Sequence, residues 1–271
     1  MINQLKGEAN TMKMQEFSDR DELRKLYPHI SDVFSYCKHC GKPEQYVDIN
    51  QNVTQDDSHS KCRRIAKFKK LSIISKFSEG AGFEKANIIN DKEKIFFESY
   101  KKYVENFDKC KDKGIGILML GNAGTGKTFA ADCIANELIK NGYAVLSFTL
   151  SGYMNEIKKG FDSSSPANNV EDELLSATSQ ADLIIIDDVG SEKITEWTSE
   201  RVFNLFNTIY MNKKSVIVTS NLSGKELSEH LTINGSNKIS DRISEMCKMF
   251  VYDWTSRRAD IGKEKFKDIF G

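Results

Sequence analysis

Gly121-Asn122-Ala123-Gly124-Thr125-Gly126-Lys127-Thr128 fills every position of the phosphate-binding pattern G-x-x-x-x-G-K-[ST], and this stretch decides the fold. An apolar run from Gly114 to Leu120 precedes it and predicts a strand. Apolar residues at helical spacing follow it until Asn141 and Gly142, which predicts a helix. The pattern requires a strand, a loop and a helix in this order, so we predict an α/β domain with a phosphate-binding loop.

The residue types of this loop suit a bound triphosphate. Its glycines let backbone N–H groups close around phosphate oxygens, and the helix that follows directs the positive end of its dipole at the same anion. We expect Lys127 to reach the β- and γ-phosphates and the Thr128 hydroxyl to ligate Mg²⁺. A glycine-rich turn that only joins a strand to a helix is the alternative, and it needs no Lys127-Thr128 pair. The sequence therefore predicts ATP and Mg²⁺ as cofactors.

Polar residues follow two further apolar runs of the chain. Leu183 to Ile186 leads into Asp187 and Asp188, and the run from Ser215 to Ser220 leads into Asn221. In open α/β sheets ligands collect at the carboxyl ends of the strands, so we expect these side chains at one edge. We predict that Asp187 holds Mg²⁺ and that Asp188 polarises the attacking water. Asn221 would orient that water or contact the γ-phosphate.

Length and charge limit the classes of protein. At 271 residues the chain has room for one α/β domain and a small module. Lys+Arg and Asp+Glu are 39 each, so any contact with DNA must come from a local patch. No apolar run approaches the length of a bilayer span, and the polar N-terminus lacks the apolar core of a signal peptide. We therefore predict a cytoplasmic protein without a membrane partner.

Three of the six cysteines gather near the N-terminus. Cys37 and Cys40 form a C-x-x-C half-site, in which two thiolates reach one tetrahedral ion across a tight turn. His59 and Cys62 are the candidate second half of a Zn²⁺ site. His39 could replace His59, although it would crowd the turn between the two thiolates. The alternative is a reduced cysteine pair that binds no metal.

The segments around the cysteines suggest how the chain is organised. We expect a polar helix before Tyr27 and a basic helix from Lys61 to Lys70, and thus a small α-rich module. The basic helix is interpreted as a solvated face, with single-stranded DNA or an acidic partner as the alternative. A last strand from Lys248 to Trp254 would leave little chain for a C-terminal lid. The predicted division is 1–73 for the module, 74–95 for a linker and 96–271 for the nucleotide-binding domain.

Four segments of the chain together resemble one family. They are GNAGTGKT from Gly121, LIIIDDVGSE from Leu183, VIVTSNLSGKEL from Val216 and KISDRISEMCKMFVYDWTSRR from Lys238. In this order they resemble the DnaC/DnaI helicase loaders, a branch of the AAA+ ATPases, and the likeness extends from about Ile74 to the C-terminus. The DDVGSE motif and the cysteine module are more similar to DnaI and its phage relatives.

The resemblance implies roles residue by residue. Lys127 and Thr128 match the Walker A residues, Asp187 and Asp188 match the Walker B pair, and Asn221 matches sensor 1. Arg242 matches an arginine that family members insert into the nucleotide site of a neighbouring subunit. Arg258 resembles the sensor 2 arginine, and the adjacent Arg257 is the other candidate for that role.

The resemblance also implies a task. Such loaders bind a replicative hexameric DNA helicase through the N-terminal module, and their ATPase domains self-associate on single-stranded DNA during replication initiation. ATP hydrolysis would couple nucleotide state to loading and release. Two departures matter: Asp188 is one methylene shorter than the Glu of many AAA+ proteins, which implies slow hydrolysis, and Ser60 replaces the first cysteine of a C-x-C pair that relatives often carry.

Two other functions fit parts of the sequence. A transposition helper ATPase of the IstB type shares the ATPase core, but the cysteine module and the DDVGSE wording argue against it. A nucleotide-gated DNA-binding adaptor with little hydrolysis is the second alternative, because Asp188 is short and little chain remains for a lid.

Overall fold

A computed structural model describes residues 25–37, 40–56, 59–72, 80–162, 167–233, 235–258, 262–263 and 266–267. Tertiary contacts divide the chain into two compact units, Met1–Lys67 and Phe68–Gly271, which we call unit 1 and unit 2. The polar helix predicted before Tyr27 lies almost entirely outside the described residues, as does the boundary predicted after residue 73.

Unit 1 contains an antiparallel three-stranded sheet, formed by β1 (Ile30–Tyr36), β2 (Pro43–Asp48) and β3 (Val53–Gln55). Tyr36 pairs with Pro43 across the cysteine-containing turn, and Val47 pairs with Val53 across the second turn. In that second turn the Asp48 carboxylate accepts hydrogen bonds from the backbone of Asn50 and Asn52, both at 2.8 Å. In the described part of unit 1 the prediction of an α-rich module is therefore wrong. Short strands joined by tight turns carry too little apolar periodicity to be recognised from the sequence.

The basic segment forms α3 (Ser60–Leu71). Ile65 and Phe68 are buried, and the charged residues of the helix are exposed. The predicted basic helix is thus present, with its apolar positions one turn apart on one side.

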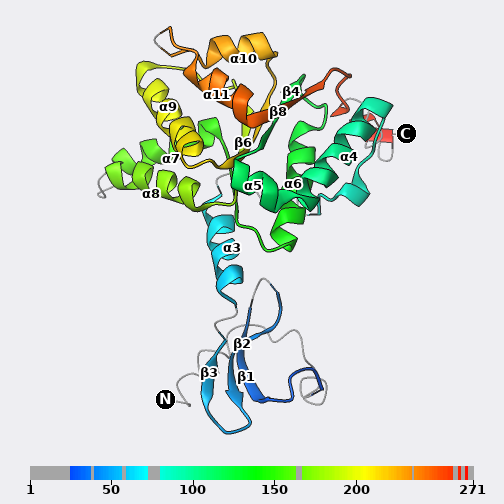
Figure 1. The fold of residues 1–271 in the computed structure, drawn as a ribbon, viewed down its shortest axis with the longest axis vertical. Coiled ribbons are helices and arrows are strands. Elements are labelled where there is room, and N and C mark those ends of the chain that lie inside the picture. Colours follow the sequence, from blue (N-terminus) through cyan, green and yellow to red (C-terminus); the bar gives the residue numbers. More distant parts are fainter. Residues whose placement is uncertain are drawn as a thin grey trace. The chain divides into compact units, whose positions relative to one another are not determined.

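Unit 2 is built on a parallel sheet, which agrees with the predicted α/β domain; it has five strands in the order β5-β6-β7-β4-β8. The strands are β4 (Gly116–Gly121), β5 (Val145–Thr149), β6 (Leu183–Val189), β7 (Ser215–Ser220) and β8 (Cys247–Tyr252). β8 is an edge strand and exposes Lys248, Met249 and Val251. The central residues of β4, β5, β6 and β7 are buried, because helices cover both faces of this part of the sheet (Figure 1). Such double coverage explains why these strands read as continuous apolar runs.

Two apolar clusters lie on the two faces of this sheet. In β4 the alternation divides Ile117 and Met119 from Leu118 and Leu120. The first pair packs with α4 (Asp91–Glu105), α5 (Phe107–Lys113) and α6 (Lys127–Lys140). The second packs with α7 (Leu150–Asp162), α8 (Ala167–Gln180), α9 (Glu196–Met211), α10 (Gly224–His230) and α11 (Lys238–Met246). A short 3₁₀ helix, η2 (Phe83–Lys85), precedes α4, and among the described helices none is long and apolar enough for a bilayer crossing.

The strand order positions the candidate site. β4 lies between β7 and β8, and β7 lies between β4 and β6. The carboxyl ends of β4, β6 and β7 are therefore adjacent, although the segments come from three distant parts of the chain.

Candidate nucleotide and metal sites

Glycines give the phosphate-binding loop its path between β4 and α6. Gly121, Gly124 and Gly126 have φ values of +137°, +78° and +102°, in the region that side chains disfavour. A Cβ on Gly121 would lie 2.1 Å from the Tyr252 carbonyl oxygen, and one on Gly124 would lie 2.1 Å from Ser256 Oγ. Among the described residues, no side chain caps the first turn of α6. Its backbone N–H groups are therefore available to an anion.

Lys127 lies folded back along this loop. Its Nζ donates to the carbonyl oxygens of Gly121 at 2.6 Å and Asn122 at 2.9 Å, and to Asn221 Oδ1 at 2.9 Å. The residue is only 6% exposed, and burial lowers the pKa of Lys127 against the opposing effect of Asp187 and Asp188. The lysine thus sits between the loop and the two acidic residues at the end of β6.

The acidic residues at the end of β6 are held by hydroxyl and amide groups. Asp187 Oδ1 accepts from Thr128 Oγ1 at 2.9 Å and from Thr219 Oγ1 at 2.6 Å. Asp188 Oδ1 accepts from Asn221 Nδ2 at 2.6 Å, and the Asp188 N–H donates to Thr219 Oγ1 at 2.9 Å. The structure therefore brings together Lys127, Thr128, Asp187, Asp188 and Asn221, the residues that the sequence places at one edge of the sheet.

The backbone at Asp188 directs its side chain toward Asn221. Asp188 has φ +57°, and the pairing of β6 with β7 shifts register between Ile186 and Val189. Such an irregularity re-aims side chains at the end of a strand. Sequence reasoning missed Thr219, which binds both acidic residues; the available signal was a hydroxyl two positions before Asn221 in an apolar strand.

The segment after β8 runs along the phosphate-binding loop. Trp254 Nε1 donates to the Thr125 carbonyl oxygen at 3.0 Å, and the Arg257 N–H donates to the Gly124 carbonyl oxygen at 2.9 Å. The charge of Arg258 also acts on Lys127 and lowers its pKa. Both arginines lie beside the loop, since a Cβ on Gly124 would lie 3.1 Å from Arg258 Cγ and one on Gly126 would lie 3.9 Å from Arg257 Cζ.

Arg257 has different partners. Its guanidinium donates to the Asn87 carbonyl oxygen at 2.6 Å and forms an ion pair with Glu93, which is 1% exposed. Glu93 also accepts from the Ile89 N–H at 2.9 Å. Arg257 therefore joins the segment after β8 to the N-terminus of α4, and its guanidinium is engaged there.

Arg242 lies on α11, where it contacts α9. Its guanidinium donates to Asn207 Oδ1 at 2.9 Å and lies over the rings of Tyr210 at 4.7 Å and Phe203 at 5.7 Å. These contacts involve neither the phosphate-binding loop nor the acidic pair of its own chain.

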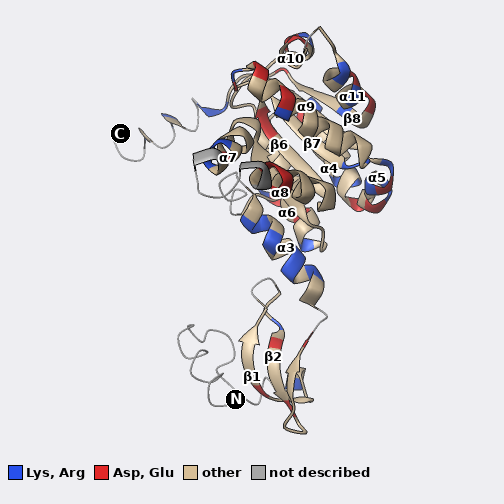
Figure 2. Cartoon of the chain, turned by 90° about the vertical axis from the view of Figure 1, so that its left-hand side faces the viewer, with Lys and Arg blue, Asp and Glu red and all other residues tan. Residues whose placement is uncertain are grey.

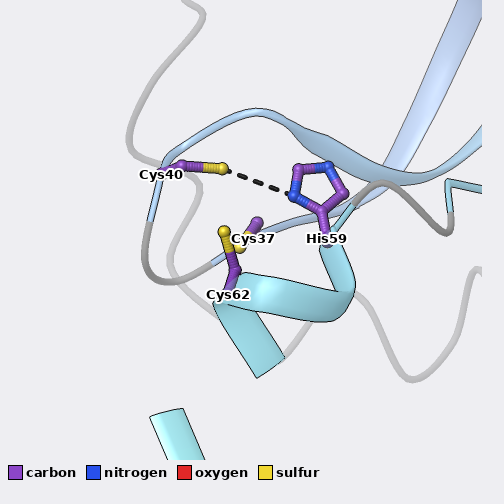
Figure 3. A group of neighbouring side chains, drawn as sticks. All are labelled: Cys37, Cys40, His59 and Cys62. Atoms are coloured by element: carbon purple, nitrogen blue, oxygen red, sulfur yellow. Dashed lines mark hydrogen bonds between the residues drawn. The ribbon is translucent and has the colours of Figure 1, made fainter. Parts of the chain in front are cut away.

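The second candidate site lies within unit 1. The potential ligand atoms of Cys37, Cys40, His59 and Cys62 all lie within 4.8 Å of one another, and Figure 3 shows the four side chains converging from the β1–β2 turn and the start of α3. Two sulfurs that bind one tetrahedral Zn²⁺ at about 2.3 Å lie about 3.8 Å apart, so the cluster fits such an ion. His39, the alternative ligand, lies outside the described residues.

The histidine of this cluster is oriented by its second nitrogen. His59 is 3% exposed, and its Nδ1 lies 3.4 Å from Cys40 Sγ. Its Nε2 lies 3.0 Å from the Pro43 carbonyl oxygen, which favours the tautomer that offers Nδ1 as a ligand. Burial and the neighbouring Cys40 and Cys37 thiols raise the pKa of Cys62 to about 12. A bound cation would reverse this effect, because it favours thiolates.

Comparisons with known proteins agree with this geometry. A family model described as "IstB-like ATP binding protein" matches residues 50–260. Phage-like element PBSX protein XkdC of Bacillus subtilis is 27% identical over 241 residues, which are 83% of this chain and 84% of XkdC. Replicative helicase loader DnaI of the same organism is 24% identical over 232 residues, 78% of this chain and 71% of DnaI.

A solved structure shares the fold. The crystal structure of the DnaC helicase loader matches with a TM-score of 0.56 and 22% identity. The match covers 66% of this chain and 99% of that chain. The predicted resemblance to the DnaC and DnaI loaders is thereby confirmed.

Proposed function

This chain belongs to the IstB-like ATP binding protein family, and from that premise we propose that it is an ATPase that loads a replicative DNA helicase onto single-stranded DNA. The observation that carries the proposal is the convergence of Lys127, Thr128, Asp187, Asp188 and Asn221 at the ends of β4, β6 and β7. Phosphoryl transfer from ATP needs a phosphate-binding lysine, Mg²⁺ ligands and a group that orients water, and these residues provide them.

Each residue has a chemical role in this proposal. Mg²⁺, when bound with ATP, would neutralise charge on the β- and γ-phosphate oxygens, with Thr128 and Asp187 as its protein ligands. Lys127 would exchange its carbonyl partners for phosphate oxygens. Asp188 and Asn221, already hydrogen-bonded to each other, would position the attacking water. Because the Asp188 side chain is short, we expect slow turnover.

The proposed partners are supported by the names of the relatives and by the position of Arg242, which contacts α9 rather than the nucleotide site of its own chain. DnaI is named a replicative helicase loader, and we propose a hexameric replicative helicase as the partner of unit 1. We propose that ATPase units associate on single-stranded DNA and that Arg242 serves the nucleotide site of a neighbouring subunit. Arg258 is proposed to face the nucleotide of its own subunit, because Arg257 is engaged with Glu93.

We propose a structural Zn²⁺ in unit 1, held by Cys37, Cys40, His59 and Cys62. The convergence of three sulfurs and one imidazole supports it, since this donor set is typical of closed structural zinc sites. His59 then occupies the position that would otherwise require a fourth cysteine.

The Lys127→Ala variant tests the nucleotide site. We expect loss of ATP binding with an unchanged fold, because the substitution removes the cation that faces the phosphates. Titration with a fluorescent ATP analogue measures the affinity, and a helicase-loading assay on single-stranded DNA measures the consequence. Lys140→Ala, at the exposed end of the same helix, is the matched control. An unchanged affinity in Lys127→Ala would refute the site.

The family description favours a second candidate, a helper ATPase for transposition. Affinity capture with the full chain, using a hexameric replicative helicase and a transposase as baits, separates the two functions. A nucleotide-gated adaptor with little hydrolysis is tested by ATP turnover with and without single-stranded DNA. Stimulated turnover would exclude the adaptor.

A further inference from the structure

The helix α3 carries the densest positive charge of the described chain. Its sequence, SKCRRIAKFKKL, contains no acidic residue, and in Figure 2 the blue of basic residues recurs along its ribbon. The basic residues are all exposed: Lys61, Arg63, Arg64, Lys67, Lys69 and Lys70. Because they share one continuous helix, their spacing along it does not depend on how the two units are arranged.

One cation of α3 has an acidic partner in unit 1, because Arg63 Nη1 donates to Glu44 Oε1 of β2 at 3.1 Å. Apolar side chains also hold the helix. Ile65 and Phe68 anchor it and are 3% and 1% exposed. Lys67 lies one turn from both Arg63 and Lys70, and like charges at this spacing repel each other. The first turn also holds basic residues rather than acidic ones, which the helix dipole disfavours. The arrangement therefore weakens the isolated helix, and a polyanion would relieve the repulsion.

We propose that α3 is a binding surface for the phosphate backbone of DNA. A helix of this length spans about 18 Å, comparable to about five phosphates of one strand. The only aromatic residue of α3, Phe68, is buried, so no ring of this helix is available for base stacking. Recognition is therefore electrostatic, independent of sequence and strongly dependent on salt.

This surface differs from the DNA contact proposed for associated ATPase units. It requires neither ATP nor a second subunit, because all of its cations lie on one helix. Because the chain has a formal net charge of +0, the attraction must be local. DNA binding by α3 can therefore be measured in the Lys127→Ala background, where nucleotide-dependent association is absent.

The test replaces Lys67, Lys69 and Lys70 by Gln in the full chain carrying Lys127→Ala. These positions lie outside the cysteine cluster, and zinc content and circular dichroism verify the fold. The matched control replaces exposed lysines of α4 and α5 and removes the same charge: Lys101→Gln, Lys102→Gln and Lys109→Gln. Fluorescence anisotropy with an oligo-dT probe measures affinity between low and moderate salt, without nucleotide.

We expect the α3 variant to lose at least about tenfold in affinity at low salt. The slope of log K against log salt should become shallower by about 2, which corresponds to three fewer phosphate contacts on a single strand. The control should keep both values. Equal losses in both variants would overturn the proposal, as would an unchanged slope in the α3 variant.

A duplex of equal length and a poly-glutamate peptide are the other probes. Loss of duplex binding in the same variant would support recognition of the phosphate backbone in either form of DNA. Poly-glutamate that binds the parent chain at least as tightly as DNA, and displaces it, would overturn the assignment in favour of an acidic protein partner.

Discussion

Unit 1 and unit 2 differ in how much apolar core stabilises each of them. Unit 2 has a five-stranded sheet with an apolar cluster on each face. In the described part of unit 1, the buried apolar side chains are Ile30, Cys37, Pro43 and Ile65, around a sheet of short strands. Small modules with few buried apolar residues are commonly stabilised by a metal or a disulfide, whereas the core of unit 2 is large enough without one.

The position of the cysteine cluster explains how a metal would compensate. Cys37 and Cys40 flank the turn between β1 and β2, and His59 and Cys62 lie at the start of α3. One ion would therefore join the sheet to the helix. We therefore expect loss of metal to affect unit 1 and loss of apolar packing to affect unit 2.

Of the changes considered, removal of zinc should have the largest effect on stability, and this effect should be confined to unit 1. We expect a chelator or Cys40→Ser to unfold this unit, since apparent zinc-binding energies reach about 10–16 kcal/mol in zinc-finger peptides. Metal analysis and hydrogen exchange resolved by segment would measure it, with ATP affinity as the control for unit 2. Substoichiometric zinc together with unchanged exchange in Cys40→Ser would remove the proposal.

The histidine ligand is tested in the same assay. Zinc retained in His59→Ala would mean that His39 or water supplies the fourth ligand.

Arg242→Ala should have the next largest effect, a loss of function in unit 2 that far exceeds the small loss of stability from its contacts with Asn207 and Tyr210. A complete arginine finger is worth about 10³–10⁵ in rate in other NTPases, so we expect hydrolysis to fall by that order while ATP affinity stays near normal. ATP-dependent assembly on single-stranded DNA should also be lost. Steady-state turnover and nucleotide titration measure the two effects.

A mixture of two inactive variants shows which subunit Arg242 serves. Mixing Arg242→Ala with Lys127→Ala creates interfaces that pair an intact loop with an intact arginine, and part of the activity should return. If activity stays absent, Arg242 acts within its own subunit and its contacts with Asn207 and Tyr210 are structural.

Glu93→Gln should destabilise unit 2 by about 3 kcal/mol. Removing one member of a buried ion pair costs about 3–5 kcal/mol, and we expect the lower end because the Arg257 side chain is 20% exposed. Thermal unfolding measures the change, and the exposed Glu98→Gln on the same helix is the control. Equal stability of the two variants would contradict a stabilising pair, and zinc content should not change in either.

Cys133→Ala should have the smallest effect on stability. It contrasts a core cysteine of unit 2 with the cysteines of the candidate zinc site. Cys133 is 1% exposed in the core of unit 2, where a thiol behaves as a small apolar group. Removing one heavy atom there should cost about 1 kcal/mol, measured by denaturant unfolding. Zinc content should stay that of the parent chain; a loss like that of Cys40→Ser would mean that Cys133 contributes to metal binding.

Much of unit 2 could be predicted from the chain because its signals are local. Gly121 to Thr128 is a contiguous pattern, and the apolar runs of β4, β6 and β7 end directly before the polar residues of the site. The antiparallel sheet of unit 1 could not be predicted in the same way. Its strands are three to seven residues long and half-exposed, so their periodicity is weak.

The sequence by itself determined the α/β class, the phosphate-binding loop and the chemistry of the residues that end the strands. Only the tertiary structure decided which distant groups meet. Thr219 reaches Asp187 because β7 lies beside β6, and Arg257 pairs with Glu93 across 164 positions of the chain. Glycine conformation and apolar periodicity act over a few residues, and are visible in any short window of sequence. A hydrogen bond between remote side chains depends on strand order, which is set by the packing of the whole sheet.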